Sequence, residues 1–220
     1  MKILLFGATG MVGQGVLREC LLDAGVTHVI CIGRRPTGLT DPKLREIVLP
    51  DPSDLSAVEG ELTDVDACFF CLGVSSVGMS EADYRRVTYE LTMTAARVLV
   101  HCNSHMTFVY VSGAGTDSTE RGRRMWARVK GATENALLRL PFRSAYMFRP
   151  GFIEPLHGVR SKTALYRRVY ALARPLFALL RRWAPGRVTT SEQMGRAMLV
   201  VARRGAPQPI LDTAAINALR

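Results

Sequence analysis

Residues 3–15 read Ile3-Leu4-Leu5-Phe6-Gly7-Ala8-Thr9-Gly10-Met11-Val12-Gly13-Gln14-Gly15. Four consecutive apolar residues predict a strand buried on both faces, and the apolar pattern after the glycines predicts a helix. Gly7 permits a tight turn, Gly10 lets the backbone approach a pyrophosphate, and Gly13 lets the helix lie against the strand. A strand, a glycine-rich turn and a helix in this order predict a dinucleotide site, with the phosphates facing the free N–H groups of the helix. The alternative is an ordinary turn between a strand and a helix.

The alternation of strand and helix continues along the chain. Further strands are predicted at residues 29–32, 44–49, 67–72, 107–111, 145–148 and 210–212, and helices near 84–99, 124–139 and 190–202. The pattern favours one α/β domain over residues 1–220, with a Rossmann-like, doubly wound parallel sheet and right-handed crossovers. Ligands of such sheets bind at the carboxyl ends of the strands. The residues expected there are Gly7, Arg34, Gly73, Ser112 and Pro150.

Composition sets the broad class of protein. With 220 residues, 48% of them hydrophobic, the chain is long enough to bury a sizeable core. It has no uncharged apolar run of about 18 residues, the length that a membrane-spanning helix needs. The short apolar stretch before the first glycine does not look like a secretory signal. We therefore expect a cytoplasmic protein.

The five cysteines are an odd number, which argues against a disulfide framework in such a protein. Cys68 and Cys71 have the CxxC spacing, but they fall in a predicted strand, where positions i and i+3 point to opposite faces. Buried packing is the favoured interpretation, and no metal site is expected. Cys71, Leu72 and Gly73 close this strand and are expected beside the cofactor.

The end of the second predicted strand discriminates between NAD and NADP. Arg34 and Arg35 stand there, about 20 residues beyond the glycine turn, where proteins that prefer NAD carry a carboxylate for the ribose 2′-hydroxyl. A guanidinium can bind a 2′-phosphate with paired hydrogen bonds, whereas a carboxylate would repel it. The two arginines predict a preference for NADP(H) over NAD(H), and a pair of solvated arginines is the alternative. Asp51, after the third strand, is expected near the adenine.

The formal net charge is +10. It suits an anionic ligand, nucleic acid or an acidic membrane surface, or simply a solvated basic surface. Residues 154–188 interleave arginines with apolar and aromatic residues. They are predicted to form a helical, substrate-side insertion, and 160–187 are a candidate dimer contact or peripheral membrane helix. No zinc finger or basic recognition helix supports specific binding of nucleic acid.

Five motifs, taken as an ordered set, resemble the short-chain dehydrogenase/reductase superfamily. The likeness is closest to its atypical, epimerase-like branch that includes the Tat-interacting oxidoreductase, and it covers nearly the whole chain. The motifs are Gly7-Ala8-Thr9-Gly10-Met11-Val12-Gly13, Val111-Ser112-Gly113, Val129-Lys130-Gly131, Phe148-Arg149-Pro150-Gly151 and Arg187-Val188-Thr189-Thr190. The residues expected to contact the cofactor within them are Gly7, Thr9, Gly10, Met11, Val12, Gly13, Lys130 and Pro150.

The resemblance implies a serine at the end of the fifth strand and a Tyr-x-x-x-Lys pair on the next helix. Ser112 matches the serine, and Lys130 matches the lysine that holds the nicotinamide ribose and lowers the pKa of the tyrosine. Trp126 stands where the tyrosine is expected, and its N–H can donate a hydrogen bond but does not give up a proton near neutral pH. In the family the serine that contacts substrate is usually the second of a pair, and here Gly113 follows Ser112. Tyrosines elsewhere that could substitute are Tyr84, Tyr89 and Tyr110.

Two functions are compatible with these residues. The first is an NADP(H)-dependent oxidoreductase or epimerase-like enzyme that acts on an unknown carbonyl or hydroxyl substrate. Ser112 would orient the carbonyl and Lys130 would hold the ribose. The second is a non-catalytic NADP(H)-binding protein that reports redox state to a partner, a possibility raised by Trp126 at the tyrosine position.

Overall fold

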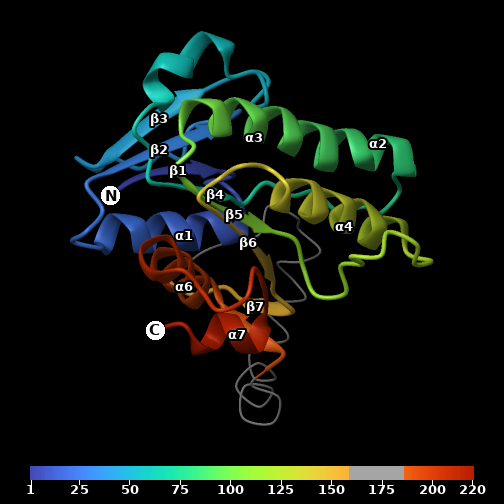
Figure 1. The fold of residues 1–220 in the computed structure, drawn as a ribbon. Coiled ribbons are helices and arrows are strands. Elements are labelled where there is room, and N and C mark those ends of the chain that lie inside the picture. Colours follow the sequence, from blue (N-terminus) through green and yellow to red (C-terminus); the bar gives the residue numbers. More distant parts are fainter. Residues whose placement is uncertain (159–185) are drawn as a thin grey trace.

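The computed structural model describes residues 1–158 and 186–220, which contain one large parallel sheet (Figure 1). Its seven strands lie in the order β3-β2-β1-β4-β5-β6-β9. They are β1 (Lys2–Phe6), β2 (His28–Gly33), β3 (Leu44–Val48), β4 (Ala67–Phe70), β5 (Thr107–Val111), β6 (Ser144–Arg149) and β9 (Ile210–Asp212). Every neighbouring pair is parallel. The Rossmann-like, doubly wound fold predicted from the sequence is confirmed, and the strand order reverses between β1 and β4.

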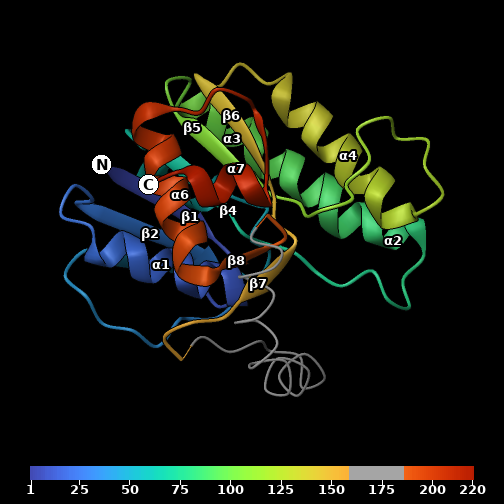
Figure 2. The ribbon, with the colours of Figure 1, turned by 90° about the horizontal axis from the view of Figure 1, so that it is seen from below.

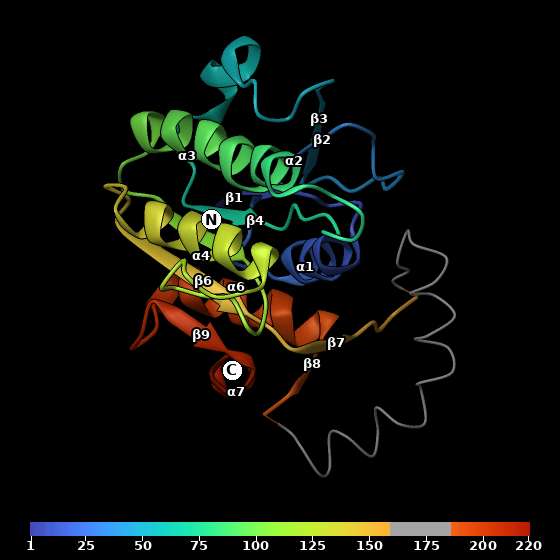
Figure 3. The same ribbon diagram turned by 90° about the vertical axis from the view of Figure 1, so that its right-hand side faces the viewer.

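Helices cover both faces of the sheet (Figure 3). One layer holds α1 (Met11–Leu22) and α6 (Ser191–Arg204), which lie side by side in Figure 2, with the short α7 (Thr213–Ala218) next to them. The other layer holds the 3-10 helix η1 (Ser56–Leu62), α3 (Leu91–Cys102) and α4 (Met125–Leu138). Successive side chains of a strand point to opposite faces, so Ile3 and Leu5 enter the first core while Leu4 and Phe6 enter the second. This double burial explains why the strands are continuously apolar.

α1 and α6 approach each other closely because two glycines lie at their crossing. A Cβ added to Gly15 would lie 2.5 Å from the carbonyl oxygen of Ser191, and one added to Gly195 would lie 2.8 Å from the Cβ of Glu19. The Glu19 carboxylate is buried at this crossing and accepts a 3.1 Å hydrogen bond from Nε of Arg196. Thr190 caps α6, since its hydroxyl accepts from the backbone N–H of Gln193 at 3.0 Å.

The helix predicted over 84–99 contains an unexpected π turn. α2 (Glu81–Arg85) continues into the π-helical turn η2 (Arg86–Glu90) and then into α3. A π turn holds more residues than an α turn, which moves the inward-facing position along the chain. A regular α-helical spacing from the buried Tyr84 would place Val87 on the buried face, but Val87 is exposed and Thr88 is buried in its place.

Two short strands and the last helix were not predicted. β7 (Phe152–Glu154) pairs in parallel with β8 (Val188–Thr190), so the two flanks of the predicted substrate-side insertion lie together. Residues 159–185 of that insertion are outside the described residues. The proposed dimer or membrane contact through 160–187 therefore falls almost entirely outside them. In the part of the chain that the structure describes, no helix is long and apolar enough to cross a membrane.

The cysteines behave as packing residues in the described structure. Cys20, Cys31 and Cys68 are buried, Cys71 and Cys102 are partly exposed, and all five are free. Within residues 1–158 and 186–220, no three His, Cys, Asp or Glu side chains are grouped so that they could hold a metal ion.

Candidate functional site

The glycine turn between β1 and α1 depends on each of its three glycines. Gly7 has a φ of +80°, and its carbonyl accepts from the N–H of Gly10 at 2.9 Å. A Cβ at Gly7 would lie 2.7 Å from the carbonyl oxygen of Cys71, and a Cβ at Gly13 only 2.1 Å from that of Gly7. Gly10 is the N-cap of α1 and supplies no capping side chain. The first N–H groups of α1 thus face the end of the sheet, where an anion would bind.

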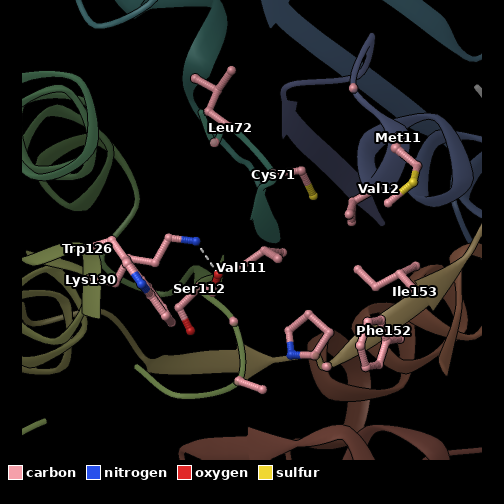
Figure 4. Close-up of a pocket in the computed structure, with 16 residues that line it drawn as sticks. Met11, Val12, Cys71, Leu72, Val111, Ser112, Trp126, Lys130, Phe152 and Ile153 are labelled. Atoms are coloured by element: carbon pink, nitrogen blue, oxygen red, sulfur yellow. Dashed lines mark hydrogen bonds between the residues drawn. The ribbon is translucent and has the colours of Figure 1, made fainter. Parts of the chain in front are cut away.

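A pocket of about 690 Å³ opens at the carboxyl ends of β1, β4, β5 and β6 (Figure 4). It brings together most of the residues predicted for the site: Gly10, Met11, Val12, Cys71, Leu72, Gly73, Ser112, Trp126, Lys130 and Pro150. The other lining residues, which were not among the predicted catalytic or cofactor-binding residues, are Val111, Gly113, Ala114, Gly151, Phe152 and Ile153. Gly7, Thr9 and Gly13 form the turn beside the pocket.

Lys130 and Trp126 reach the pocket from the same face of α4, because residues four apart in a helix lie one above the other. The Nζ of Lys130 donates a hydrogen bond to the backbone carbonyl of Ser112, drawn as a dashed line in Figure 4. Burial lowers the pKa of Lys130 to about 8, and the negative charge of Glu134 opposes that shift. Near neutral pH this amine can therefore lose and regain a proton.

Trp126 is seated on the glycine-rich loop that follows β5. Gly115 has a φ of +85°, and a Cβ there would lie 3.4 Å from Cη2 of the indole. Gly113 has a φ of +145°, which side chains rarely tolerate, and a Cβ there would lie 3.9 Å from the Nζ of Lys130. The backbone at the position of the family's second serine therefore suits glycine, and it leaves space in front of the lysine.

The side chain of Ser112 points away from Lys130. Its hydroxyl is buried and donates to the carbonyl oxygen of Phe148 at 3.1 Å. In this arrangement Ser112 contributes its backbone carbonyl to the lysine and ties the ends of β5 and β6 together. A catalytic role for its hydroxyl would require the side chain to turn into the pocket.

None of the three candidate replacement tyrosines lines the described pocket. Tyr84 and Tyr110 are buried, and burial raises the pKa of both hydroxyls. Tyr89 lies on η2, where the guanidinium of Arg85 stacks over its ring at 4.2 Å from the centroid. Cys71 does line the pocket, but burial raises the pKa of its thiol far above the usual value.

A buried ion pair behind the pocket was not predicted from the sequence. Glu134, one turn beyond Lys130 on α4, is fully buried, and both its oxygens accept from Nε of Arg149 at 3.1 Å. The Nη2 atom of Arg149 also donates to Glu134 and to the hydroxyl of Ser118. The sequence signal that could have indicated this pair is a carboxylate among small and apolar residues on the buried face of a predicted helix.

Asp117 organises the polar loop between β5 and α4. Its carboxylate accepts from the hydroxyl and N–H of Thr119 at 2.7 and 3.0 Å and from the N–H of Gly122 at 2.6 Å. These hydrogen bonds, that from the Thr119 hydroxyl foremost, hold the pKa of Asp117 below its usual value. Arg128 on α4 donates to the carbonyl of Gly122 at 2.6 Å, so the loop is fastened to the helix that carries Lys130.

The residues predicted to contact the adenosine half of the cofactor lie outside the pocket. Arg34 and Arg35 are exposed just after β2, the strand beside β1, and neither makes an ion pair with another described residue. Asp51 is exposed beyond β3 and accepts from the N–H and hydroxyl of Ser53 at 2.9 and 2.7 Å. The two guanidinium groups are thus exposed beyond the carboxyl end of β2, whereas the Asp51 carboxylate already accepts hydrogen bonds from Ser53.

The glycine turn, the pocket and the strand order can be compared with known proteins. The model of the NAD dependent epimerase/dehydratase family matches residues 3–122, more than half of the chain. The chain belongs to the NAD dependent epimerase/dehydratase family. The match covers the glycine turn and the loop after β5, and it ends before α4 and its lysine.

Solved structures of low identity share the fold of this family member. MoeE5 in complex with UDP-glucose and NAD aligns with a TM-score of 0.67 and 19% identity, over 96% of this chain and 75% of that one. WbmF of Bordetella bronchiseptica in complex with NAD+ aligns with a TM-score of 0.68 and 14% identity, over 98% and 76%. A short chain dehydrogenase/reductase family oxidoreductase from Burkholderia thailandensis aligns with a TM-score of 0.67 and 16% identity, over 100% and 94%. At these identities the neighbours show that the fold is shared.

Curated relatives correct one expectation from the sequence. Protein FMP52-1, mitochondrial, of Scheffersomyces stipitis is 26% identical over 155 residues, 70% of this chain and 67% of the relative. Protein fmp52, mitochondrial, of Emericella nidulans is 27% identical over 159 residues, 69% and 66%. The matched part thus spans about two thirds of each relative. The expected cytoplasmic location is contradicted, because these relatives are named as mitochondrial proteins.

Proposed function

We propose that this epimerase/dehydratase family member binds NADP(H) and transfers hydride between the nicotinamide and a carbonyl or hydroxyl substrate. The observation that carries the proposal is the convergence of the glycine turn and Lys130 on one pocket at the switch point of the sheet. The fold neighbours with NAD bound and the family of the chain support the binding of a nicotinamide dinucleotide.

The residues present fit such a cofactor. The N-terminus of α1, behind Gly10, would hold the pyrophosphate, because no side chain caps its N–H groups. The close packing of Gly7 and Gly13 also keeps the turn from protruding toward the phosphates. Lys130 would hold the nicotinamide ribose, and the ends of β4 and β6, at Gly73 and Pro150, would flank the ring. The cofactor supplies hydride chemistry when bound, and the protein orients the substrate and moves the proton.

Arg34 and Arg35 support NADP(H) over NAD(H). Replacing both with alanine is expected to weaken NADPH binding about 10- to 100-fold, because charge-assisted hydrogen bonds to the 2′-phosphate are lost, while NADH binding changes less than about twofold. Calorimetric titration with both nucleotides measures the two effects. The matched control is Arg97→Ala/Arg204→Ala, which removes two exposed arginines on α3 and α6 and the same net charge. Equal losses for NADPH and NADH would refute the preference.

A second candidate is a non-catalytic NADP(H)-binding protein that reports redox state to a partner. The specific observation in its favour is Trp126 at the tyrosine position, together with the absence of any tyrosine among the described lining residues. The two functions differ in one measurement. The enzyme oxidises NADPH when a suitable carbonyl compound is added, whereas the sensor binds NADPH and leaves it reduced.

A further inference from the structure

The described lining of the pocket contains very few groups that can exchange a proton. Cys71 and Lys130 are the two ionisable side chains among the residues that line it. Burial keeps the thiol of Cys71 protonated far into the alkaline range by raising its pKa. Lys130 is therefore the lining side chain with an exchangeable proton near neutral pH.

The hydroxyl groups that would normally supply this proton are missing or turned away. The Ser112 hydroxyl donates to Phe148, Gly113 offers no side chain, and Trp126 carries an indole N–H. That N–H has no partner among the described residues, so it can hydrogen-bond to a substrate oxygen, but it cannot be deprotonated there. Recognition and proton transfer must then fall to different side chains.

We propose that the amine of Lys130 takes over the role of the missing tyrosine as proton donor and acceptor for the substrate oxygen. This inference rests on the proposed function. In the reducing direction, the ammonium of Lys130 gives up one proton as the carbonyl carbon gains hydride from the reduced nicotinamide. The carbonyl π pair moves to oxygen, the O–H bond forms and the N–H bond breaks. The neutral amine then takes a proton from water, and the oxidising direction runs these steps in reverse.

The position of Lys130 allows this cycle. One of its three N–H donors is used by the carbonyl of Ser112, which leaves the others for the pocket. The pKa of about 8 keeps both protonation states populated near neutral pH. The charged and titratable groups around it are Glu134 on α4, Arg149 on β6, Cys71 after β4, and Tyr84 and Tyr110 beyond Glu134. The ion-pair partner of Glu134 among the described residues is Arg149 and not Lys130.

The remaining walls indicate the class of substrate. Six of the other lining side chains are apolar or aromatic, namely Met11, Val12, Leu72, Val111, Phe152 and Ile153, and in Figure 4 Met11, Val12, Phe152 and Ile153 lie across the pocket from Lys130. No described lining residue is a carboxylate or an arginine. Such a surface favours an uncharged ketone or aldehyde, or the corresponding alcohol, with apolar substituents. Trp126 would donate to the same oxygen that Lys130 protonates.

The first experiment titrates the amine itself in the cofactor-free protein. Trace acetylation with acetic anhydride modifies only neutral amines, so the labelling of each lysine against pH reports its protonation by mass spectrometry. We expect a midpoint near pH 8 for Lys130, well below the pKa of about 10.4 of an ordinary lysine side chain. A midpoint of Lys130 at that ordinary value would overturn the proposal.

The second experiment uses the full chain with saturating NADPH and a panel of apolar aldehydes and ketones. Lys130→Arg keeps the positive charge but cannot release a proton. It should lower kcat at least about 100-fold and remove the fall in rate as pH rises through 8. Trp126→Tyr in the Lys130→Arg background should restore part of the rate by supplying a hydroxyl.

The outcomes separate the two proposals. A Lys130→Arg protein that keeps its rate within tenfold, or keeps the pH profile, would overturn the role of the lysine. NADPH that binds but is oxidised with no carbonyl compound of the panel would also overturn it, and it would leave the proposed cofactor site standing. Failure of NADPH and NADH to bind would instead overturn the proposed function.

Discussion

Gly131→Ala is expected to destabilise the protein by about 3 kcal/mol or more, although alanine is the better helix former. A Cβ at this position would lie 1.8 Å from the carbonyl oxygen of Asp117, and 2.6 Å from its carbonyl carbon. The obstacle is backbone, so it cannot be relieved by turning a side chain. Either α4 or the loop at Asp117 must move, and the loop is held by the hydrogen bonds to Thr119 and Gly122. Urea unfolding followed by circular dichroism measures the loss.

Gly60→Ala is the matched control for this prediction. Gly60 lies in η1, it is exposed, and nothing lies within 4 Å of a Cβ built there. The substitution should be neutral or stabilise by about 0.4–1 kcal/mol, because alanine restricts the unfolded chain. If Gly131→Ala were as harmless as Gly60→Ala, the close approach of Asp117 to α4 would be wrong.

Arg149→Met is expected to cost about 3–5 kcal/mol of unfolding free energy, because it leaves the carboxylate of Glu134 buried without its partner. Glu134 is fully buried, and both of its oxygens accept from Arg149. The methionine fills most of the volume of the arginine stem, so the loss reports the charge rather than a cavity. Urea unfolding at pH 7 gives the difference.

The double variant Glu134→Met/Arg149→Met distinguishes the effect of removing the whole ion pair from the effect of removing one partner. Replacement of a buried ion pair by apolar residues is often nearly neutral, so the double variant should recover most of the stability that Arg149→Met loses. A loss of less than about 1 kcal/mol for Arg149→Met would contradict the buried pair. Because Glu134 raises the pKa of Lys130, the double variant should also move the labelling midpoint of Lys130 below pH 8.

Much of the fold was predictable because local sequence and final position agree. Continuous apolar runs mark strands covered on both faces, and all seven strands of the large sheet lie within two residues of their predicted ends. The glycine turn was recognisable because its glycines are spaced for contacts within a few residues, such as that of Gly13 with Gly7. The pocket residues at the strand ends follow from the parallel order of the sheet.

The unpredicted features depend on contacts between distant residues or on local irregularity. β7 and β8 contain three residues each, and their pairing joins segments that are far apart in sequence. The π turn at Arg86–Glu90 has no signal in an otherwise regular helical pattern, so Val87 was placed on the wrong face. The orientation of the Ser112 hydroxyl and the pairing of Glu134 with Arg149 are matters of side-chain geometry, which spacing alone does not determine.

The close crossing of α1 and α6 has a consequence for how the protein is made. The apolar side of α1, at Val16, Leu17 and Cys20, is completed by Met194 and Met198 of α6. The ribosome synthesises α6 long after α1, so the nascent chain carries this apolar face uncovered until α6 emerges. Closure of this layer must therefore wait for α6, and the growing chain must be protected from self-association until then.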